Sequence, residues 1–265
     1  MFNSFSESSI TEFFQSIYRT LKEFNPELTE IWCEPLDIDF LRDLEHNERK
    51  ELISHFDFLT IKKGNYIDYV IIDKILFIIR SLNYLHLDIS FLSNLLDYEG
   101  FEALTQLILS ENGYYTLKNY RFTDKSQFKS KTKQSKYEID VIGIYRNIIL
   151  LIDCKQWKRK DSYSAMNKAA NLQYRRALAL YNNREIFSEM IQSLVGLKKM
   201  QNVKPPLLIV PLMVTLESNW IKINENSIPI VSIHRFNSFL QELYNNLYYF
   251  KIVKVNKLQI QKQLM

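Results

Sequence analysis

The sequence predicts an α/β fold preceded by an all-helical N-terminal region. From residue 96 onward, runs of apolar and β-branched residues alternate with segments whose apolar side chains recur at helical spacing. Only five glycines occur among 265 residues, which favours helices over open turns. A chain of this length can bury a full core in one large or two modest domains. We expect a helical domain over residues 1–95, an α/β core over 96–250 and a basic tail over 251–265.

The N-terminal region is expected to form three helical stretches, at residues 9–24, 39–59 and 67–96, with a break near His86 in the last. The apolar run at 69–79 is too short for the ~18 residues that a membrane span requires. We interpret it as a core helix. Residues 1–60 hold thirteen acidic and five basic residues, which makes this region a poor surface for DNA. Packing, dimerisation and regulation are its candidate roles.

Residues 137–157, YEIDVIGIYRNIILLIDCKQW, predict a β-hairpin with a two-residue loop at Arg146 and Asn147. Asn147 is expected to adopt the positive φ that such loops need. Tyr145 then lies opposite Ile148. By the same register Asp140 lies opposite Asp153, and Glu138 lies opposite Lys155. Residues that alternate along a strand share a face, so all four charged side chains converge on one side of the hairpin.

Two interpretations of this convergence are open. A surface hairpin often carries solvated charges, and a Glu–Lys pair across two strands is an ordinary contact. Two aspartates directly opposite each other destabilise a sheet, however, and a divalent cation between them would relieve their repulsion. The second strand is also apolar without alternation over residues 148–152, as in strands that are buried on both faces. The pattern therefore favours a metal site over a surface hairpin.

The elements around the hairpin follow an ordered pattern of helices and buried strands. The segment before it has apolar residues at helical spacing and ends near Gly113, and Glu102 lies at its start. Further helices and strands are expected behind the hairpin. In chain order, the predicted segments are a helix at 100–114, the hairpin, a helix at 162–182, strands at 207–216 and 228–233, and a helix at 236–247.

This set of residues resembles the PD-(D/E)xK, or restriction-endonuclease-like, nuclease superfamily. Asp140 and the sequence Asp153-Cys154-Lys155 match its central motif, with Asp in place of the more common Glu. Glu102 takes the acidic position that many members have on the preceding helix. Gln173 is similar to a glutamine that several subfamilies carry, although the tyrosine spacing of the RecB-type motif is missing. Within the superfamily, archaeal Holliday-junction resolvases and modification-dependent restriction nucleases are nearest in impression.

The resemblance covers about residues 95–250 and implies a mixed central β-sheet flanked by helices. It also implies a Mg²⁺-dependent endonuclease that hydrolyses phosphodiester bonds in DNA, with Mn²⁺ able to replace Mg²⁺. Asp140, Asp153, the Cys154 backbone carbonyl and Glu102 would hold the metal, and Lys155 would activate the attacking water. Gln173 would belong to the same site. Glu138 would orient Lys155 or act as an additional acid, or would form only an ion pair.

The charge distribution points to a polyanionic partner. Residues 114–136 hold seven basic residues and one acidic residue, and residues 155–176 have the same balance. A basic run is often only a solvated surface, but dense Lys and Arg next to a carboxylate site favour nucleic acid over a small metabolite. The candidate nucleic-acid-binding residues are Arg121, Lys129, Lys131, Lys133, Lys136, Lys158, Arg159, Lys160 and Arg176.

Two alternatives remain open: a non-catalytic nucleic-acid-binding or assembly protein on a nuclease fold, and an RNA-directed nuclease with the same site. A homodimer is expected if both strands of a duplex are cut, because this calls for two sites related by a two-fold axis. The two cysteines, Cys33 and Cys154, are far apart, and the N-terminus carries no secretory signal, so we expect a cytoplasmic protein. Zinc motifs, Gly-rich phosphate loops and membrane segments are not found in the sequence.

Overall fold

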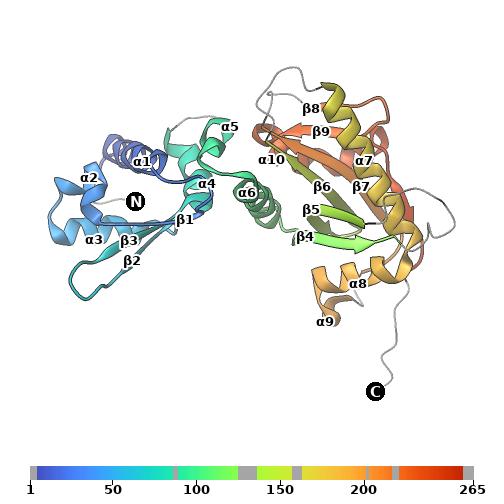
Figure 1. The fold of residues 1–265 in the computed structure, drawn as a ribbon, viewed down its shortest axis with the longest axis horizontal. Helices are drawn as coiled ribbons and strands as arrows, with labels where there is room; N and C mark the ends of the chain where they lie inside the picture. The colour runs from blue at the N-terminus through green and yellow to red at the C-terminus, as the bar shows by residue number, and fades with distance from the viewer. Residues whose placement is uncertain are drawn as a thin grey trace. The chain divides into compact units, whose positions relative to one another are not determined.

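The structure is a computed structural model that describes residues 5–85, 89–124, 136–156, 163–200, 203–216 and 221–258 (Figure 1). The chain divides into two compact units, Met1–Phe101 and Glu102–Met265. The boundary lies within helix α6 (Tyr98–Glu111), close to the expected boundary at residue 96. Among the described residues, no helix is long and apolar enough to cross a membrane.

The first unit combines short helices with a three-stranded antiparallel sheet in the order β1-β3-β2. The expectation of an all-helical region is therefore wrong. Its elements are α1 (Glu7–Lys22), β1 (Glu30–Cys33), η1 (Pro35–Asp37), α2 (Asp39–Arg42), α3 (His46–His55), β2 (Leu59–Lys62), β3 (Tyr69–Asp73), α4 (Lys74–Leu85), α5 (Ile89–Leu92) and η2 (Ser93–Leu95).

The apolar run at 69–79 is half strand and half helix. Strand β3 pairs on both sides, with Val70 and Ile72 buried, and this pairing outweighs the helical spacing of the run. At its end the Asp73 carboxylate accepts the backbone N–H groups of Ile75 and Leu76, each at 2.9 Å. These contacts cap the start of α4, so the run changes from strand to helix at Asp73.

A cluster of aromatic rings forms the core of this unit. Phe14 on α1 is fully buried, and its ring centroid lies 5.1 Å from that of Phe56, 5.3 Å from Phe58 and 5.7 Å from Phe77. Offset and edge-to-face aromatic pairs at such distances are favourable beyond the area they bury. The rings join α1, the α3–β2 connection and α4 into one core.

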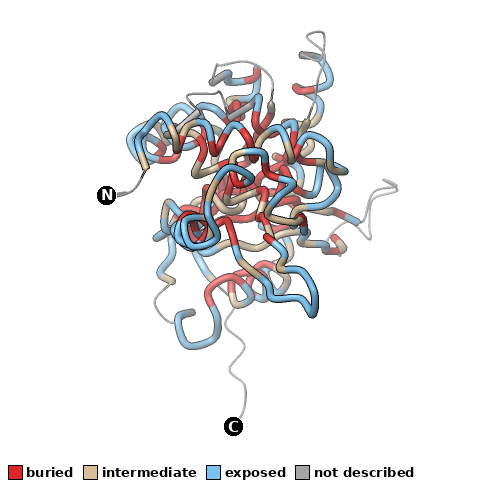
Figure 2. The backbone as a smooth tube through the Cα atoms, turned by 90° about the vertical axis from the view of Figure 1, so that its left-hand side faces the viewer, coloured by how far each residue is buried: buried red, intermediate tan, exposed pale blue. Residues whose placement is uncertain are grey.

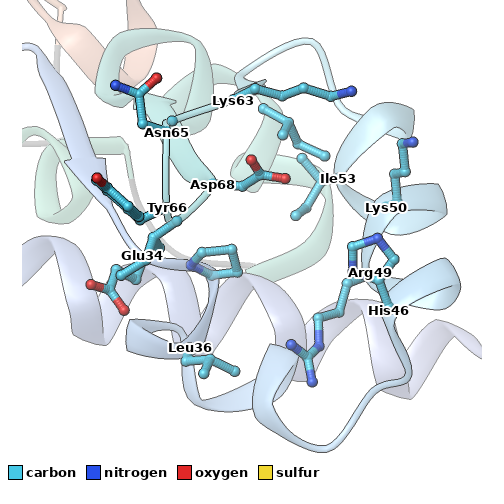
Figure 3. A pocket seen from close by; sticks show the side chains of 14 residues that line it. Glu34, Leu36, His46, Arg49, Lys50, Ile53, Lys63, Asn65, Tyr66 and Asp68 are labelled. Carbon is cyan, nitrogen blue, oxygen red and sulfur yellow. The ribbon is translucent and has the colours of Figure 1, made fainter.

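A surface hollow of about 500 Å³ lies between α3 and the loop that follows β2 (Figure 3). His46, Arg49 and Lys50 of α3 line one part of it, and Lys63 lines another. Glu34 and Asp68 also line the hollow, so groups of both charges surround it.

The second unit is built on a seven-stranded mixed sheet, and it confirms the predicted α/β core with helices around a central sheet. The strand order is β4-β5-β6-β7-β9-β8, with β10 paired to β7; β7 runs parallel to β6 and β9, and the other pairs are antiparallel. After α6, its elements are β4 (Tyr115–Thr123), β5 (Lys136–Tyr145), β6 (Ile148–Lys155), α7 (Tyr163–Asn182), α8 (Arg184–Val195), α9 (Leu197–Met200), β7 (Leu207–Thr215), β8 (Ile221–Ile223), β9 (Pro229–Ser232), α10 (Ile233–Asn246), η3 (Leu247–Tyr249) and β10 (Val253–Val255).

The hairpin has the predicted register. Five pairs connect β5 and β6, from Tyr145 opposite Ile148 to Val141 opposite Ile152. The expected positive φ at Asn147 is wrong, because Arg146 adopts it instead, with φ 54°. Asn147 is held by other contacts: its side-chain amide donates to the Pro206 carbonyl at 3.2 Å. Its own carbonyl accepts the N–H of Leu208 at 2.8 Å.

Helices cover both faces of the central sheet. Ile142 and Ile144 of β5 share a buried cluster with residues of α7 and α8. Gly143 lies between them, so a side chain at this position would point to the opposite face of the sheet. A Cβ atom there would lie 3.1 Å from the Leu109 side chain of α6. Helices α7 and α6 therefore lie on opposite faces of the sheet. Strands β6 and β7 are buried along nearly their whole length. Figure 2 shows the buried residues in red along the backbone.

The C-terminal segment was expected to be a basic tail. Within it, Val253–Val255 form strand β10, which pairs with the start of β7. Val253 and Val255 are buried against the sheet. Part of this segment is thus structural, and only three residues of alternating pattern, Val-Lys-Val, indicate it in the sequence.

Candidate functional site

The candidate site lies where strands β5 and β6 separate. The ladder between them ends at Val141 and Ile152, one pair before Asp140 and Asp153. Beyond that point the Asp140 carboxylate accepts the backbone N–H of Cys154 at 2.8 Å. Asp140 therefore supplies the hydrogen-bond acceptor that a continued ladder would have provided. This contact holds the carboxylate at the end of β6, and the Asp140 side chain is only 9% exposed.

Lys155 lies between the two aspartates. Its Nζ atom is 3.3 Å from Asp153 Oδ2 and 3.9 Å from Asp140 Oδ2. The first distance is that of a close ion pair, and the second is at the outer limit of one. The Lys155 side chain is 26% exposed, which is more than either carboxylate. Lys155 is thus the member of the cluster that is most accessible to a ligand.

Asp153 has a second basic partner from α7. Arg176 Nη1 lies 2.6 Å from Asp153 Oδ1 and also donates to Gln173 Oε1 at 2.7 Å. Gln173 and Arg176 are three residues apart on the helix, which places them on the same side of it. Asp153 and Lys155 alternate with Leu151, which packs in the α7 cluster, so they point to the face that α7 covers. Sequence reasoning placed Arg176 on the nucleic-acid surface and did not anticipate its pair with Asp153.

Glu102 approaches the site from the opposite face of the sheet. Cys154 alternates with Asp153, so its thiol points to the α6 side. Burial raises the pKa of this thiol well above its usual value, and the charges of Asp140, Glu102 and Asp153 raise it further. A hydrogen bond with Thr105 of α6 acts in the other direction. The structure thus brings all three predicted carboxylates around Cys154. Thr105 was missed, although it lies one turn after Glu102 on the same side of the helix.

The donor set fits a hard divalent cation in part. Asp153 Oδ2 is buried and forms no hydrogen bond among the described residues, but Lys155 Nζ lies 3.3 Å from it, so a metal ion there would share this oxygen with Lys155 or displace the ammonium group. Across the described residues, however, no three His, Cys, Asp or Glu side chains already form a metal-binding group. Asp140 accepts the backbone N–H of Cys154, and one oxygen of Asp153 accepts from Arg176. Mg²⁺ typically takes one or two carboxylates and completes its shell with water and phosphate, so two aspartates suffice.

Of the other residues predicted for the site or for nucleic-acid binding, those that the structure describes do not join the cluster around Asp153. Glu138 was expected to lie against Lys155, but this expectation is wrong: Glu138 pairs across β4–β5 with Arg121 at 2.8 Å. Arg121 and Lys136 are exposed and line a surface hollow of about 470 Å³ at the end of these strands. The other candidate nucleic-acid-binding residues lie outside the described residues: Lys129, Lys131, Lys133, Lys158, Arg159 and Lys160.

Comparison with known proteins gives a match to one family model. Residues 97–210 match the nuclease-related domain, and this segment includes α6, the hairpin and α7. No curated protein matches the chain. Among solved structures, the chain is similar to protein VC1899 from Vibrio cholerae, with 13% sequence identity and a TM-score of 0.30. That comparison covers 93% of this chain and 57% of the other, so the chain spans little more than half of that protein.

Proposed function

We propose that the protein is a metal-dependent nuclease that hydrolyses phosphodiester bonds in DNA, because residues 97–210 match the nuclease-related domain, which belongs to the PD-(D/E)xK superfamily. One observation carries the proposal. Within the matched domain, Asp140, Asp153 and Lys155 meet at the end of β6, and Glu102 approaches the same point from the other face.

The metal would be held by Asp140 and Asp153, together with the Cys154 backbone carbonyl and with Glu102 through water. Mg²⁺ is the proposed ion and Mn²⁺ a substitute, since both accept oxygen ligands. A bound ion of this kind polarises a phosphoryl oxygen and lowers the pKa of water. Asp153 Oδ2 supports this assignment, because it is a buried carboxylate oxygen that forms no hydrogen bond among the described residues and is balanced by the Lys155 ammonium at 3.3 Å, where a metal ion would add positive charge.

Lys155 would act on the attacking water and on the charge that develops on the phosphate. Its ammonium group has three donors and is held by two carboxylates at the exposed edge of the cluster. From there the ammonium group can orient a water molecule and donate a hydrogen bond to the transition state, and it could take a proton from the water only after losing one of its own. Glu138 is bonded to Arg121, so we propose no catalytic role for it.

The substrate class rests on the superfamily and on charge. Arg121 and Lys136 are exposed close to the start of β5, the strand that carries Asp140. Cations at such a place would bind the phosphate backbone and release counterions. We propose DNA as the polymer, and a homodimer where both strands of a duplex are cut.

The test is a cleavage panel with Mg²⁺ or Mn²⁺ on duplex, single-stranded and branched DNA and on RNA. We expect cleavage of at least one DNA substrate, and its loss in Asp153→Ala and Lys155→Ala. Asp57→Ala, which removes an exposed carboxylate in the first unit, is the matched control and should cleave normally. Full metal-dependent activity of Asp153→Ala would refute the site. Binding of DNA without cleavage would favour the non-catalytic alternative, and cleavage of RNA alone would refute the substrate.

A further inference from the structure

Three buried polar atoms around Asp153 have no hydrogen-bond partner among the described residues. They are Asp153 Oδ2, Gln173 Nε2 and Arg176 Nε. They belong to one connected group, because Arg176 Nη1 binds both Asp153 Oδ1 and Gln173 Oε1. Lys155 Nζ is 3.3 Å from Asp153 Oδ2 as an ion pair but does not form a hydrogen bond with it. Asp153 Oδ2 thus has an ionic partner, whereas Gln173 Nε2 and Arg176 Nε are donors without an acceptor in the described part of the chain. Buried polar groups are nearly always paired, so these two donors indicate a missing acceptor.

The hydrogen-bonding roles of the three atoms, as donors or acceptors, define which groups a ligand must provide. Gln173 Oε1 accepts from a guanidinium, which has only donors, and this leaves Gln173 Nε2 as a free donor. Arg176 Nε is also a donor, whereas Asp153 Oδ2 is an acceptor. A metal ion can pair with the carboxylate oxygen but accepts no hydrogen bond. The two donors therefore need an oxygen acceptor from another group, in the same connected group of side chains as Asp153.

We propose that Gln173 and Arg176 form a phosphate clamp, in which their free N–H groups bind a non-bridging oxygen of the phosphate that lies next to the metal on Asp153. The proposal rests on the proposed function and names the groups that would hold the phosphodiester. Arg176 supplies a fixed positive charge and Gln173 a neutral donor, a combination suited to an anionic oxygen. Both side chains are positioned on the regular helix α7 rather than on a loop.

Entry to the clamp would be from the side of Lys155. Gln173 is fully buried and the Arg176 side chain is 13% exposed, whereas the Lys155 side chain is 26% exposed. Because the three atoms are covered, phosphate binding must be accompanied by local opening. A buried water molecule could pair with the same atoms, and this is the alternative that an experiment has to separate. Phosphate and water differ in charge, so a charge-changing but isosteric substitution distinguishes them.

Gln173→Glu is that substitution. The new carboxylate still accepts from Arg176, so the position of Arg176 is kept, but the free donor becomes a negative acceptor that repels phosphate. Arg176→Gln is the second variant, since it removes the cation. The controls make the same changes elsewhere in the same unit: Gln192→Glu on α8, and Arg175→Gln at the exposed neighbour of Arg176.

Binding of labelled duplex DNA in Ca²⁺ is measured by fluorescence anisotropy, and binding of Mn²⁺ alone by calorimetry. We expect Gln173→Glu and Arg176→Gln to raise the Kd for DNA about tenfold or more, as for loss of a charge-assisted hydrogen bond. Neither should weaken Mn²⁺ binding, and the controls should match wild type. Circular dichroism verifies the fold of each variant.

Two outcomes would overturn the clamp. If wild type binds and cleaves DNA while both folded variants bind it as tightly as their controls, a buried water alone occupies the group, and the nuclease assignment stands. If Gln173→Glu weakens Mn²⁺ and DNA binding equally, Gln173 acts only through the structure of the metal site. Absence of any metal or DNA binding by wild type would overturn the clamp and the proposed function together.

Discussion

Replacing Asp153 by Asn tests the buried pair at the centre of the candidate site. The substitution keeps the shape of the side chain and removes its charge. Asp153 is 3% exposed and Arg176 is 13% exposed at the side chain, with 2.6 Å between them, so solvent screens the pair weakly. After the substitution the Arg176 cation is left buried with neutral acceptors, the amide oxygens of the new asparagine and of Gln173.

The size of the effect follows from this burial. Removing one partner of a buried ion pair costs ~3–5 kcal/mol, because the other charge stays uncompensated. Gln173 still accepts from Arg176, and Lys155 can turn toward solvent, so we expect the lower end, about 3 kcal/mol. For a unit of this size that corresponds to a fall in Tm of about 6–12 °C. The measurement is urea and thermal unfolding at pH 7 in EDTA, followed by circular dichroism.

Asp57→Asn is the matched control. Asp57 pairs with Arg80 at 2.8 Å, but both side chains are exposed, at 53% and 41%. The hydrogen bonds from Arg80 lower the pKa of the Asp57 carboxyl below its ordinary 3.8. The pair therefore stabilises the fold above pH ~4, and the contribution is lost as the pH falls through the folded-state pKa. An exposed pair contributes at most ~1 kcal/mol. Equal losses in Asp153→Asn and Asp57→Asn, or no loss in the former, would refute the reasoning from burial.

Three further outcomes are expected. Phe14→Ala should lower the free energy of unfolding of the first unit by about 3–5 kcal/mol, because it removes a fully buried ring. Phe91 is 46% exposed, so Phe91→Ala should lower it far less when both variants are unfolded in urea. Burial raises the pKa of Cys33 to about 11 and that of Cys154 well above its usual value, so neither thiol should react with a thiol reagent at pH 8 until urea is added; rapid labelling of the native chain would contradict their burial. Mg²⁺ at a hundredfold excess over its Kd should stabilise the wild type by about 2.7 kcal/mol and leave Asp153→Asn unchanged, and equal shifts in calorimetry would exclude Asp153 as a ligand.

The sequence predicted the hairpin in detail because local rules determine it. Alternating faces and a two-residue loop define the register, and the structure confirms five of its pairs. The register predicted for the hairpin does not hold beyond Val141 and Ile152, where strands β5 and β6 separate. Asp140 binds the Cys154 amide there, and Glu138 turns to Arg121, a partner on a strand that the sequence did not predict.

Other differences come from contacts between distant segments. Val70 and Ile72 alternate, but the run that contains them is short, and it fits a helix equally well until β1 and β2 pair with it. Those partners are strands of four residues each, too short to recognise alone. Arg176 belongs to a basic segment that is typical of a solvated surface. Only the packing of α7 on β6 turns this side chain toward Asp153.

The hairpin loop has a consequence at the far end of the sheet. Asn147 joins the loop to the first residues of β7, and from there β6 and β7 run parallel for eight pairs, from Ile148 and Leu208 to Lys155 and Thr215. Slippage by one residue along this ladder would turn Asp153 and Lys155 to the opposite face. Asn147 therefore helps to set which face of the sheet Asp153 and Lys155 point to, although it lies at the opposite end of β6 from them.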